Sequence, residues 1–372
     1  MNVEGVFMYS EKDLVRIAKR ENNTKRSYLV VNRLQGKHIP VKPSEAFAMF
    51  HELAEILKDS YSKERLLLVG FAETATAIGA AVAAELGSEY IQTTREVVEH
   101  AEYIFFSEEH SHATEQKLVK NDLDSIIDKV DRIIFIEDEV TTGKTIRNMI
   151  EVLSKMYSEG VPYAVASLLN GMDETALQLY AQKGIPLHYL VKTNHEKYHE
   201  AAEKFAEDGE YVPCNTDTPK IGTELRISGA RNARRRISAR EYEEACETLW
   251  KQTFHALEKE LYGRVLVLGT EEFMYPALYI AKNMEQMGCE VVSHATTRSP
   301  IAVSADPQYP LHVRYELCSL YDKERVTFVY DIDAYDTVLI VTDAQAKEVE
   351  GFHSLVNAAS RKNDRIFCIR WC

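Results

Sequence analysis

Residues 133–145 read Ile-Ile-Phe-Ile-Glu-Asp-Glu-Val-Thr-Thr-Gly-Lys-Thr, and this stretch decides the fold class. Its four apolar residues predict a short buried strand that ends at two carboxylates, Glu137 and Asp138. In an open α/β sheet, ligands bind outside the carboxyl ends of the strands. Backbone N–H groups entering a helix N-terminus bind phosphate. Two acids beside such a turn suit a sugar phosphate, because the carboxylates can bind ribose hydroxyls or Mg²⁺. The hydroxyl-rich turn before the predicted helix is Thr141, Thr142, Gly143, Lys144 and Thr145.

A nucleotide-triphosphate P-loop is the obvious alternative for this turn. That motif needs a glycine, four further residues and then Gly-Lys-Ser/Thr. The run from Gly143 to Thr145 fits its end, but its first glycine would fall on Asp138. A carboxylate there would repel the phosphates, so we exclude a P-loop.

The stretch instead resembles the 5-phosphoribosyl-1-pyrophosphate (PRPP) motif of type I phosphoribosyltransferases. That motif has four apolar residues, two acids, two usually apolar residues and a Thr/Ser-rich glycine turn. The resemblance implies that Glu137 and Asp138 hold the ribose 2′- and 3′-hydroxyls, with Mg²⁺ as the cofactor at these acids. It also implies that Thr141 to Thr145 hold the 5′-phosphate. Glu139 departs from the pattern, because the family usually has an apolar residue there. The non-functional interpretation is an ordinary strand–turn–helix with an acidic N-cap.

Composition limits the class of protein. A chain of 372 residues is too long for one typical domain, so we expect two. The net charge of −14 argues against nucleic acid or a membrane surface as the main partner. No apolar run is long enough for a membrane span, and Met1 to Ser10 lacks a signal-peptide pattern. The six scattered cysteines form no C-x-x-C pair. They therefore predict free thiols in a reducing cytoplasm and no zinc site.

A second strand–turn–helix precedes the PRPP-like motif in the chain. Leu66 to Val69 predicts a buried strand, and an Ala-rich helix follows the turn as far as Leu86. In the phosphoribosyltransferase interpretation, backbone N–H groups of this turn bind pyrophosphate, and Gly70 lets the chain approach closely. The turn alone is weak evidence, since many α/β proteins have one, but its position before the PRPP-like motif strengthens it. The turn is Gly70-Phe71-Ala72-Glu73-Thr74.

A polar stretch from Glu108 to Thr114 lies between the two turns, after an expected strand at Tyr103 to Phe106. Type I phosphoribosyltransferases often carry a mobile loop here that closes over PRPP and excludes water. His110 and His112 alternate, so an extended chain would place both on one side. They could bind pyrophosphate, act as acid or base, or bind metal. A surface loop without a role for either histidine is the equally weighted alternative.

The rest of the first domain, residues 1–211, alternates strands with helices. This alternation predicts a mostly parallel sheet flanked by helices, as in the type I phosphoribosyltransferase fold. We expect the polar helix from His195 to Ala206 to close the domain. Further strands are expected at Tyr28 to Leu34, Tyr163 to Leu169 and Leu187 to Val191, and helices at Pro43 to Leu57, Ile146 to Tyr157 and Glu174 to Lys183.

Residues 212–238 are expected to form a linker or lid before a second domain at 239–372. Prolines and glycines interrupt the segment, and the run from Arg231 to Arg236 stands out in an acidic chain. A solvated loop is one interpretation of this run. Anion recognition is the other, because arginine forks suit phosphates and carboxylates.

The second domain repeats the order of the first. Three stretches recur at offsets of 199, 203 and 205 residues, which favours a duplicated, partly degenerate α/β unit. The copy lacks the phosphate turn, because Ala344 to Lys347 contains neither Gly nor Thr. We therefore expect it not to bind PRPP in the same way. The matching stretches are Leu66–Gly70 with Val265–Gly269, Thr93–Glu96 with Thr296–Pro300, and Ile133–Asp138 with Val338–Asp343.

The run from Thr297 to Pro300 (Thr-Arg-Ser-Pro) resembles the TRSP domain. That domain is found fused behind phosphoribosyltransferase domains in bacterial proteins of tellurite-resistance-associated gene clusters. The resemblance covers nearly the whole chain, including Gly36 to Pro40 and His110 to Ala113. It implies an enzyme that makes a nucleoside-like metabolite. Candidates for a second site are Thr270, Glu271, Glu272 and Arg298, with domain packing as the competing explanation.

The sequence leaves three functions open. The first is Mg²⁺-dependent phosphoribosyl transfer from PRPP to a small-molecule nitrogen acceptor, and the second is the reverse cleavage of a nucleotide by pyrophosphate or phosphate. The third is PRPP sensing without catalysis, although known sensors of this kind usually act on nucleic acid, which the charge of −14 disfavours. We expect the transferase, with PRPP and the acceptor as partners, no nucleic acid or membrane, and a homodimer as a compatible assembly. The identity of the acceptor cannot be read.

Overall fold

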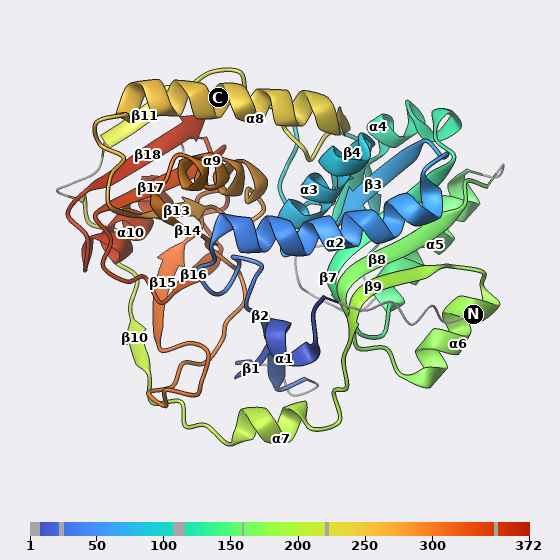
Figure 1. The fold of residues 1–372 in the computed structure, drawn as a ribbon, viewed down its shortest axis with the longest axis horizontal. Coiled ribbons are helices and arrows are strands. Elements are labelled where there is room, and N and C mark those ends of the chain that lie inside the picture. Colours follow the sequence, from blue (N-terminus) through green and yellow to red (C-terminus); the bar gives the residue numbers. More distant parts are fainter. Residues whose placement is uncertain (1–7, 22–25, 107–115, 158–159, 220–222, 346–348) are drawn as a thin grey trace. The chain divides into compact units, whose positions relative to one another are not determined.

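The chain was analysed as a computed structural model, which describes residues 8–21, 26–106, 116–157, 160–219, 223–345 and 349–372 (Figure 1). It folds into two compact units that interleave along the sequence. Unit 1 comprises Met1–Glu11, Ala48–Asn194 and Arg231–Glu244. Unit 2 comprises Lys12–Phe47, His195–Ala230 and Ala245–Cys372. Two of the boundaries fall within long helices, α2 (Pro43–Tyr61) and α8 (Ala239–Leu257).

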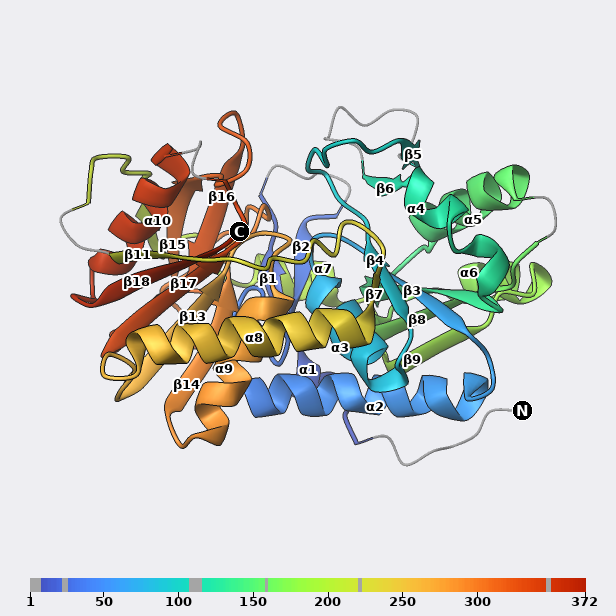
Figure 2. The same ribbon diagram turned by 90° about the horizontal axis from the view of Figure 1, so that it is seen from above.

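Unit 1 contains a six-stranded sheet in the order β12-β4-β3-β7-β8-β9. All neighbours are parallel except β12 (Ile237–Ser238), which is antiparallel to β4. The chain passes from β3 to β4 on one side and returns to β7 on the other, so the strand order reverses between β3 and β7. In open α/β sheets this switch point is where ligands bind. The strands are β3 (Leu66–Gly70), β4 (Glu89–Gln92), β7 (Arg132–Val140), β8 (Tyr163–Asn170) and β9 (Leu187–Lys192) (Figure 2).

The helices of unit 1 follow from their side-chain patterns. Helix α3 (Thr76–Leu86) is small and apolar almost all round, so most of it is buried. Helix α5 (Lys144–Met156) buries residues 146, 149, 150 and 153, which is the spacing of one helical face. Helix α6 (Glu174–Gln182) begins at Asp173, whose carboxylate accepts the Ala176 N–H at 2.7 Å. These helices carry the loops at the carboxyl ends of the strands.

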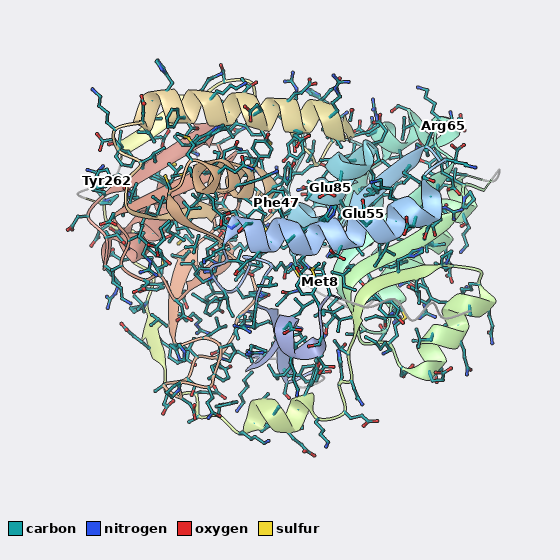
Figure 3. The ribbon with its side chains drawn as sticks, viewed as in Figure 1. Met8, Phe47, Glu55, Arg65, Glu85 and Tyr262 are labelled. Atoms are coloured by element: carbon teal, nitrogen blue, oxygen red, sulfur yellow. The ribbon has the colours of Figure 1, made fainter. Side chains whose placement is uncertain are left out.

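The switch-point strands are also joined at their amino ends. Arg65 (labelled in Figure 3) precedes β3, and Asp131 precedes β7. The Arg65 guanidinium donates to both Asp131 carboxylate oxygens, at 3.0 and 2.9 Å. Between β4 and β7 the chain forms an antiparallel hairpin, β5 (Tyr103–Phe105) and β6 (Lys117–Val119), and the short helices α4 (Lys120–Asp124) and η1 (Ile127–Lys129).

Unit 2 contains a fully parallel five-stranded sheet in the order β11-β18-β17-β13-β14. Its order reverses between β13 and β17. The strands are β11 (Thr223–Ile227), β13 (Arg264–Gly269), β14 (Glu290–Ala295), β17 (Thr337–Thr342) and β18 (Ile366–Trp371), and the helices between them are α9 (Tyr275–Gln286) and α10 (Val349–Ser360).

Two smaller sheets complete unit 2. One has the order β10-β15-β16 and the other pairs β1 with β2. Apolar residues of the β1–β2 pair pack with those around β16 in one core cluster. These elements are β1 (Val15–Lys19), β2 (Tyr28–Asn32), β10 (Glu210–Val212), β15 (Val313–Cys318), β16 (Val326–Tyr330) and the helices α1 (Glu11–Leu14) and α7 (Tyr198–Glu203).

The two units share one topology, which supports the predicted duplication. The order β4-β3-β7-β8 in unit 1 corresponds to β14-β13-β17-β18 in unit 2, and each unit inserts an antiparallel hairpin before its third strand. An isolated bridge joins Thr94 to Lys117 in unit 1 and Thr297 to Phe328 in unit 2. Likewise, Thr93 N–H donates to Gly70 O, and Thr296 N–H donates to Gly269 O.

Several details differ from the sequence-based expectations. The segment 212–238 is more than a linker, because it supplies β11 to the five-stranded sheet and β12 to the six-stranded sheet. The helix expected at 195–206 spans only Tyr198–Glu203, and α2 continues to Tyr61. No helix among the described residues has the length and apolar character needed to span a membrane.

Candidate functional site

The Gly70–Thr74 turn contacts the end of β7 at the switch point of unit 1. Strands β3 and β7 pair so that Gly70 lies opposite Ile136, one residue before the acids. The Phe71 N–H donates to Ile136 O at 3.0 Å. The Thr74 hydroxyl donates to Asp138 Oδ1 at 2.8 Å. A direct hydrogen bond therefore joins the expected pyrophosphate turn to an expected ribose-binding acid.

The backbone of the Gly70–Thr74 turn is clamped by two polar side chains. The Ala72 N–H donates to Thr93 Oγ1 at 2.8 Å, and Gln116 Nε2 donates to Ala72 O at 2.7 Å. The peptide between Ala72 and Glu73 is cis. Gly70 is needed for packing as well, since a Cβ there would lie 2.5 Å from the Tyr90 hydroxyl. The sequence gives no sign of these roles for Thr93 and Gln116, because the fold alone brings both side chains to the turn.

Three successive carboxylates, Glu137 to Glu139, end β7, and all are half-buried. The strand was expected to end at Glu137 and Asp138, but it continues to Val140, so the acids lie among its last residues. Burial, together with the Asp138 charge, raises the pKa of Glu137 well above its usual range. Burial and then the Glu139 charge raise the pKa of Asp138 to about 6, although the Thr74 hydroxyl acts in the opposite direction. Such a cluster favours ligands that bring positive charge or hydroxyl donors.

The turn from Thr141 to Thr145 enters α5 at Gly143, which adopts a positive φ of 62°. A Cβ there would collide with the Tyr180 hydroxyl and would lie 2.6 Å from Met172 Cε. The Tyr180 hydroxyl donates to Gly143 O at 2.7 Å, and Arg147 N–H donates to the same oxygen at 3.0 Å. The N-cap residue Gly143 has no side chain to cap α5, and the Lys144 N–H donates to Thr142 Oγ1 at 3.3 Å. The turn is therefore a fixed backbone shape at a helix N-terminus, which suits a phosphate.

Glu137 and Asp138 can supply only part of the coordination shell of a Mg²⁺ ion. Among the described residues, no group of three or more His, Cys, Asp or Glu side chains forms a metal-binding cluster. Mg²⁺ commonly takes one or two protein carboxylates and completes its shell with water and substrate phosphates. Glu137 and Asp138, with their raised pKa values, fit that limited contribution.

The other predicted site residues have different outcomes. His110 and His112 lie outside the described residues. The arginine run binds acids of its own unit: Arg235 donates twice to Asp122 at 2.8 Å, and Arg236 pairs with Glu89 at 2.5 Å. These two arginines attach the segment after β11 to the rest of unit 1. Neither the solvated loop nor anion recognition, the two interpretations of the sequence, included this role.

The four second-site candidates gather at the carboxyl ends of β13 and β14 in unit 2. The buried Glu271 carboxylate accepts from the Ser319 hydroxyl at 2.6 Å and from Arg325 at 2.9 Å. Arg298 donates to Glu272 at 3.0 Å, and the Thr270 hydroxyl bonds to Thr342 at 2.8 Å. This network favours domain packing, because the charges are neutralised within the unit. A ligand-binding role for these residues stays a prediction.

Lys37, in the run from Gly36 to Pro40, belongs to the same network. Lys37 is fully buried, and its ammonium donates to Glu271 O and Thr296 O, both at 2.8 Å. Asp343, which corresponds to Asp138, accepts from the Tyr321 hydroxyl at 2.7 Å. The unit 2 switch point is thus filled by its own side chains where unit 1 has a phosphate turn.

Comparison with known protein families agrees with this geometry. Residues 14–194 match PRTase_2, described as "Phosphoribosyl transferase". Residues 229–359 match TRSP, described as "TRSP domain C terminus to PRTase_2". The chain joins a phosphoribosyltransferase-family domain to a TRSP domain. The predicted domain boundaries at 211 and 238 stay predictions, because the two matches leave residues 195–228 unassigned. No curated protein sequence matches the chain.

Solved structures of phosphoribosyltransferases align with the PRTase_2–TRSP chain at low similarity. Adenine phosphoribosyltransferase from Rhodothermus marinus is 16% identical, with 49% of this chain and 96% of that chain covered and a TM-score of 0.35. The Trypanosoma brucei enzyme in complex with AMP, pyrophosphate and ribose-5-phosphate is 14% identical, covering 48% and 76%, with a TM-score of 0.35. Orotate phosphoribosyltransferase from Aeropyrum pernix is 18% identical, covering 52% and 93%, with a TM-score of 0.31. Because these scores are low, the assignment depends on the family matches.

Proposed function

We propose that this chain transfers the phosphoribosyl group of PRPP to a nitrogen of a small, nucleobase-like acceptor and releases pyrophosphate. The observation that carries the proposal is the 2.8 Å hydrogen bond from the Thr74 hydroxyl to Asp138. It links the turn expected to bind pyrophosphate to the acids expected to bind ribose. The bond that breaks in PRPP joins the ribose to the pyrophosphate, so both groups must lie at neighbouring sites.

The roles of the residues follow from their chemistry. Carboxylates accept hydrogen bonds from hydroxyls, so Glu137 and Asp138 bind the ribose 2′- and 3′-hydroxyls. Backbone N–H groups of the Thr141–Thr145 turn, at the N-terminus of α5, bind the 5′-phosphate. The turn from Gly70 to Thr74 faces the leaving pyrophosphate, with Thr93 and Gln116 fixing its backbone. These groups hold PRPP so that the acceptor nitrogen can approach C1 of the ribose.

Charge accounts for much of the expected catalysis. When the bond between C1 and pyrophosphate breaks, the ribose becomes cation-like and the pyrophosphate gains negative charge. The carboxylates at 137–139 lie on the ribose side and stabilise positive charge there. When bound, Mg²⁺ would neutralise pyrophosphate oxygens, and Glu137 and Asp138 are the residues that would hold it. As the new C–N bond forms, the acceptor nitrogen gives its proton to the leaving pyrophosphate or to water.

The direct experiment incubates the purified full chain with PRPP, Mg²⁺ and a small-molecule cell extract, followed by mass spectrometry. The proposal predicts a new ribosylated phosphate product together with stoichiometric pyrophosphate. The variant Asp138→Asn should lose both while keeping its circular dichroism and melting temperature. Unchanged turnover in that variant would refute the assignment, and PRPP binding without any pyrophosphate release across a panel of bases would indicate a sensor.

A further inference from the structure

A groove that takes no part in the proposed reaction lies in unit 1 between α5 and residues 183–185, which directly follow α6. Its volume is about 560 Å³. That is within the range of roughly 300–1,000 Å³ that is usual for small-molecule sites. The groove runs along α5 from Arg147 to Lys155, which corresponds to about 12 Å of helix. It reaches the first residues of β7 and β8, so it opens at the amino ends of the strands, away from the acids of β7.

The groove is basic although the chain is acidic. Four cationic side chains and one carboxylate line it, whereas the whole chain has 44 Lys and Arg against 58 Asp and Glu. The Nε atom of Arg147 is buried and has no hydrogen-bond partner among the described residues. The single acid, Glu151, pairs with Lys183 at 3.0 Å, and both side chains are about half exposed. Exposed pairs of this kind are weak, so a ligand phosphate can take the place of the carboxylate. The cations are Arg147, Lys155 and Lys183, together with Arg132, whose guanidinium already donates to the Glu64 carboxylate at 2.7 and 3.1 Å.

One wall of the groove is apolar and aromatic. Ile150, Pro162 and Ile185 line it beside the ring of Tyr163. That ring is stacked on Phe135, with centroids 6.0 Å apart and planes at 17°, so its position is fixed. A flat apolar ring can pack against such a wall while a phosphate contacts the cations. We infer that this groove binds a nucleotide, a phosphate monoester attached to an aromatic base.

The walls of the groove connect to the phosphate turn. Helix α5 begins at Gly143, and Arg147 N–H donates to Gly143 O. From α6, the Tyr180 hydroxyl donates to the same oxygen at 2.7 Å. A ligand bound along α5 and the segment 183–185, which directly follows α6, therefore contacts the two chain segments that hold Gly143 O in place. The groove is thus a regulatory nucleotide site, which goes beyond the proposed transfer reaction and does not depend on it.

Photo-crosslinking of the full chain with 8-azidoadenosine 5′-monophosphate tests the site. Peptide mass spectrometry should locate adducts on the segments around Tyr163 or Ile185, and AMP should compete for them while adenosine should not. Adducts found only on the peptide carrying residues 133–145 would overturn the inference, as would equal competition by adenosine. This readout does not need PRPP turnover, so failure of the proposed reaction and failure of the groove can be told apart.

Charge variants supply the second test. Lys155→Glu with Lys183→Glu should weaken AMP binding in the groove at least tenfold, and the milder Lys155→Gln should weaken it severalfold without adding repulsion. The matched control is Lys63→Glu, an exposed lysine outside the groove, which should leave binding unchanged. Equal binding by all variants would refute the site. If AMP changes PRPP affinity equally in the wild type and in the variant that carries both Lys155→Glu and Lys183→Glu, the regulatory role is wrong.

Discussion

Replacing Gly143 with alanine tests the phosphate turn most specifically. Gly143 has a φ of 62°, and the left-handed conformation costs an L-residue about 1–2 kcal/mol. The added Cβ would also meet the Tyr180 ring and Met172 Cε at 2.6–2.7 Å. Forcing an extra methyl into a packed site costs about 1–3 kcal/mol. We therefore expect Gly143→Ala to lower the free energy of unfolding by about 2–5 kcal/mol.

Gly87 provides the matched control for this substitution. It has the same φ of 62°, but a Cβ there would meet nothing within 4 Å. Gly87→Ala should therefore show only the backbone cost of about 1–2 kcal/mol. Urea unfolding followed by circular dichroism measures both values, and titration calorimetry measures PRPP affinity. Gly143→Ala should weaken PRPP binding at least tenfold, while Gly87→Ala should not. Equal stability losses and unchanged PRPP affinity would refute the reasoning.

Three further predictions concern single polar contacts. Thr74→Val removes a hydrogen bond to the Asp138 carboxylate, worth about 1.5–3 kcal/mol, and should weaken PRPP binding roughly tenfold or more by calorimetry. Lys37→Met leaves two buried carbonyls without their donor and should cost about 2–4 kcal/mol in urea unfolding, whereas Lys63→Met should cost almost nothing. Burial lowers the pKa of His294 from 6.5 to about 4, so the folded state favours the neutral imidazole. The free energy of unfolding should therefore be constant above pH 6.5 and should fall by about 3 kcal/mol in total as the pH drops toward 4. His294→Gln should flatten that fall.

The fold could be predicted where the sequence pattern is local. The apolar runs just before Gly70 and Glu137 predicted the strands β3 and β7, because parallel strands are buried on both faces. The short strands β10, β11 and β12 were not predicted, since each depends on a partner far away in the sequence. The interleaving of the two units was not predicted for the same reason.

The candidate site shows the same division. The acids and the glycine turn were predicted, because their chemistry lies in one continuous stretch. Thr93 and Gln116 were missed, because their clamp on Ala72 depends on pairing between strands and on a residue just before β6. The burial of Lys37, in the charged run from Gly36 to Pro40, was not predicted either. Local charge gives no sign of a burial that distant segments create.

The central claim is that the unit 1 switch point, and not its copy in unit 2, binds PRPP. Titration calorimetry with PRPP and Mg²⁺ on the full chain tests it through two equivalent substitutions, Asp138→Asn and Asp343→Asn. We predict one PRPP site per chain, at least a tenfold loss of affinity for Asp138→Asn, and unchanged affinity for Asp343→Asn. Loss in the Asp343 variant with normal binding in the Asp138 variant would contradict the account.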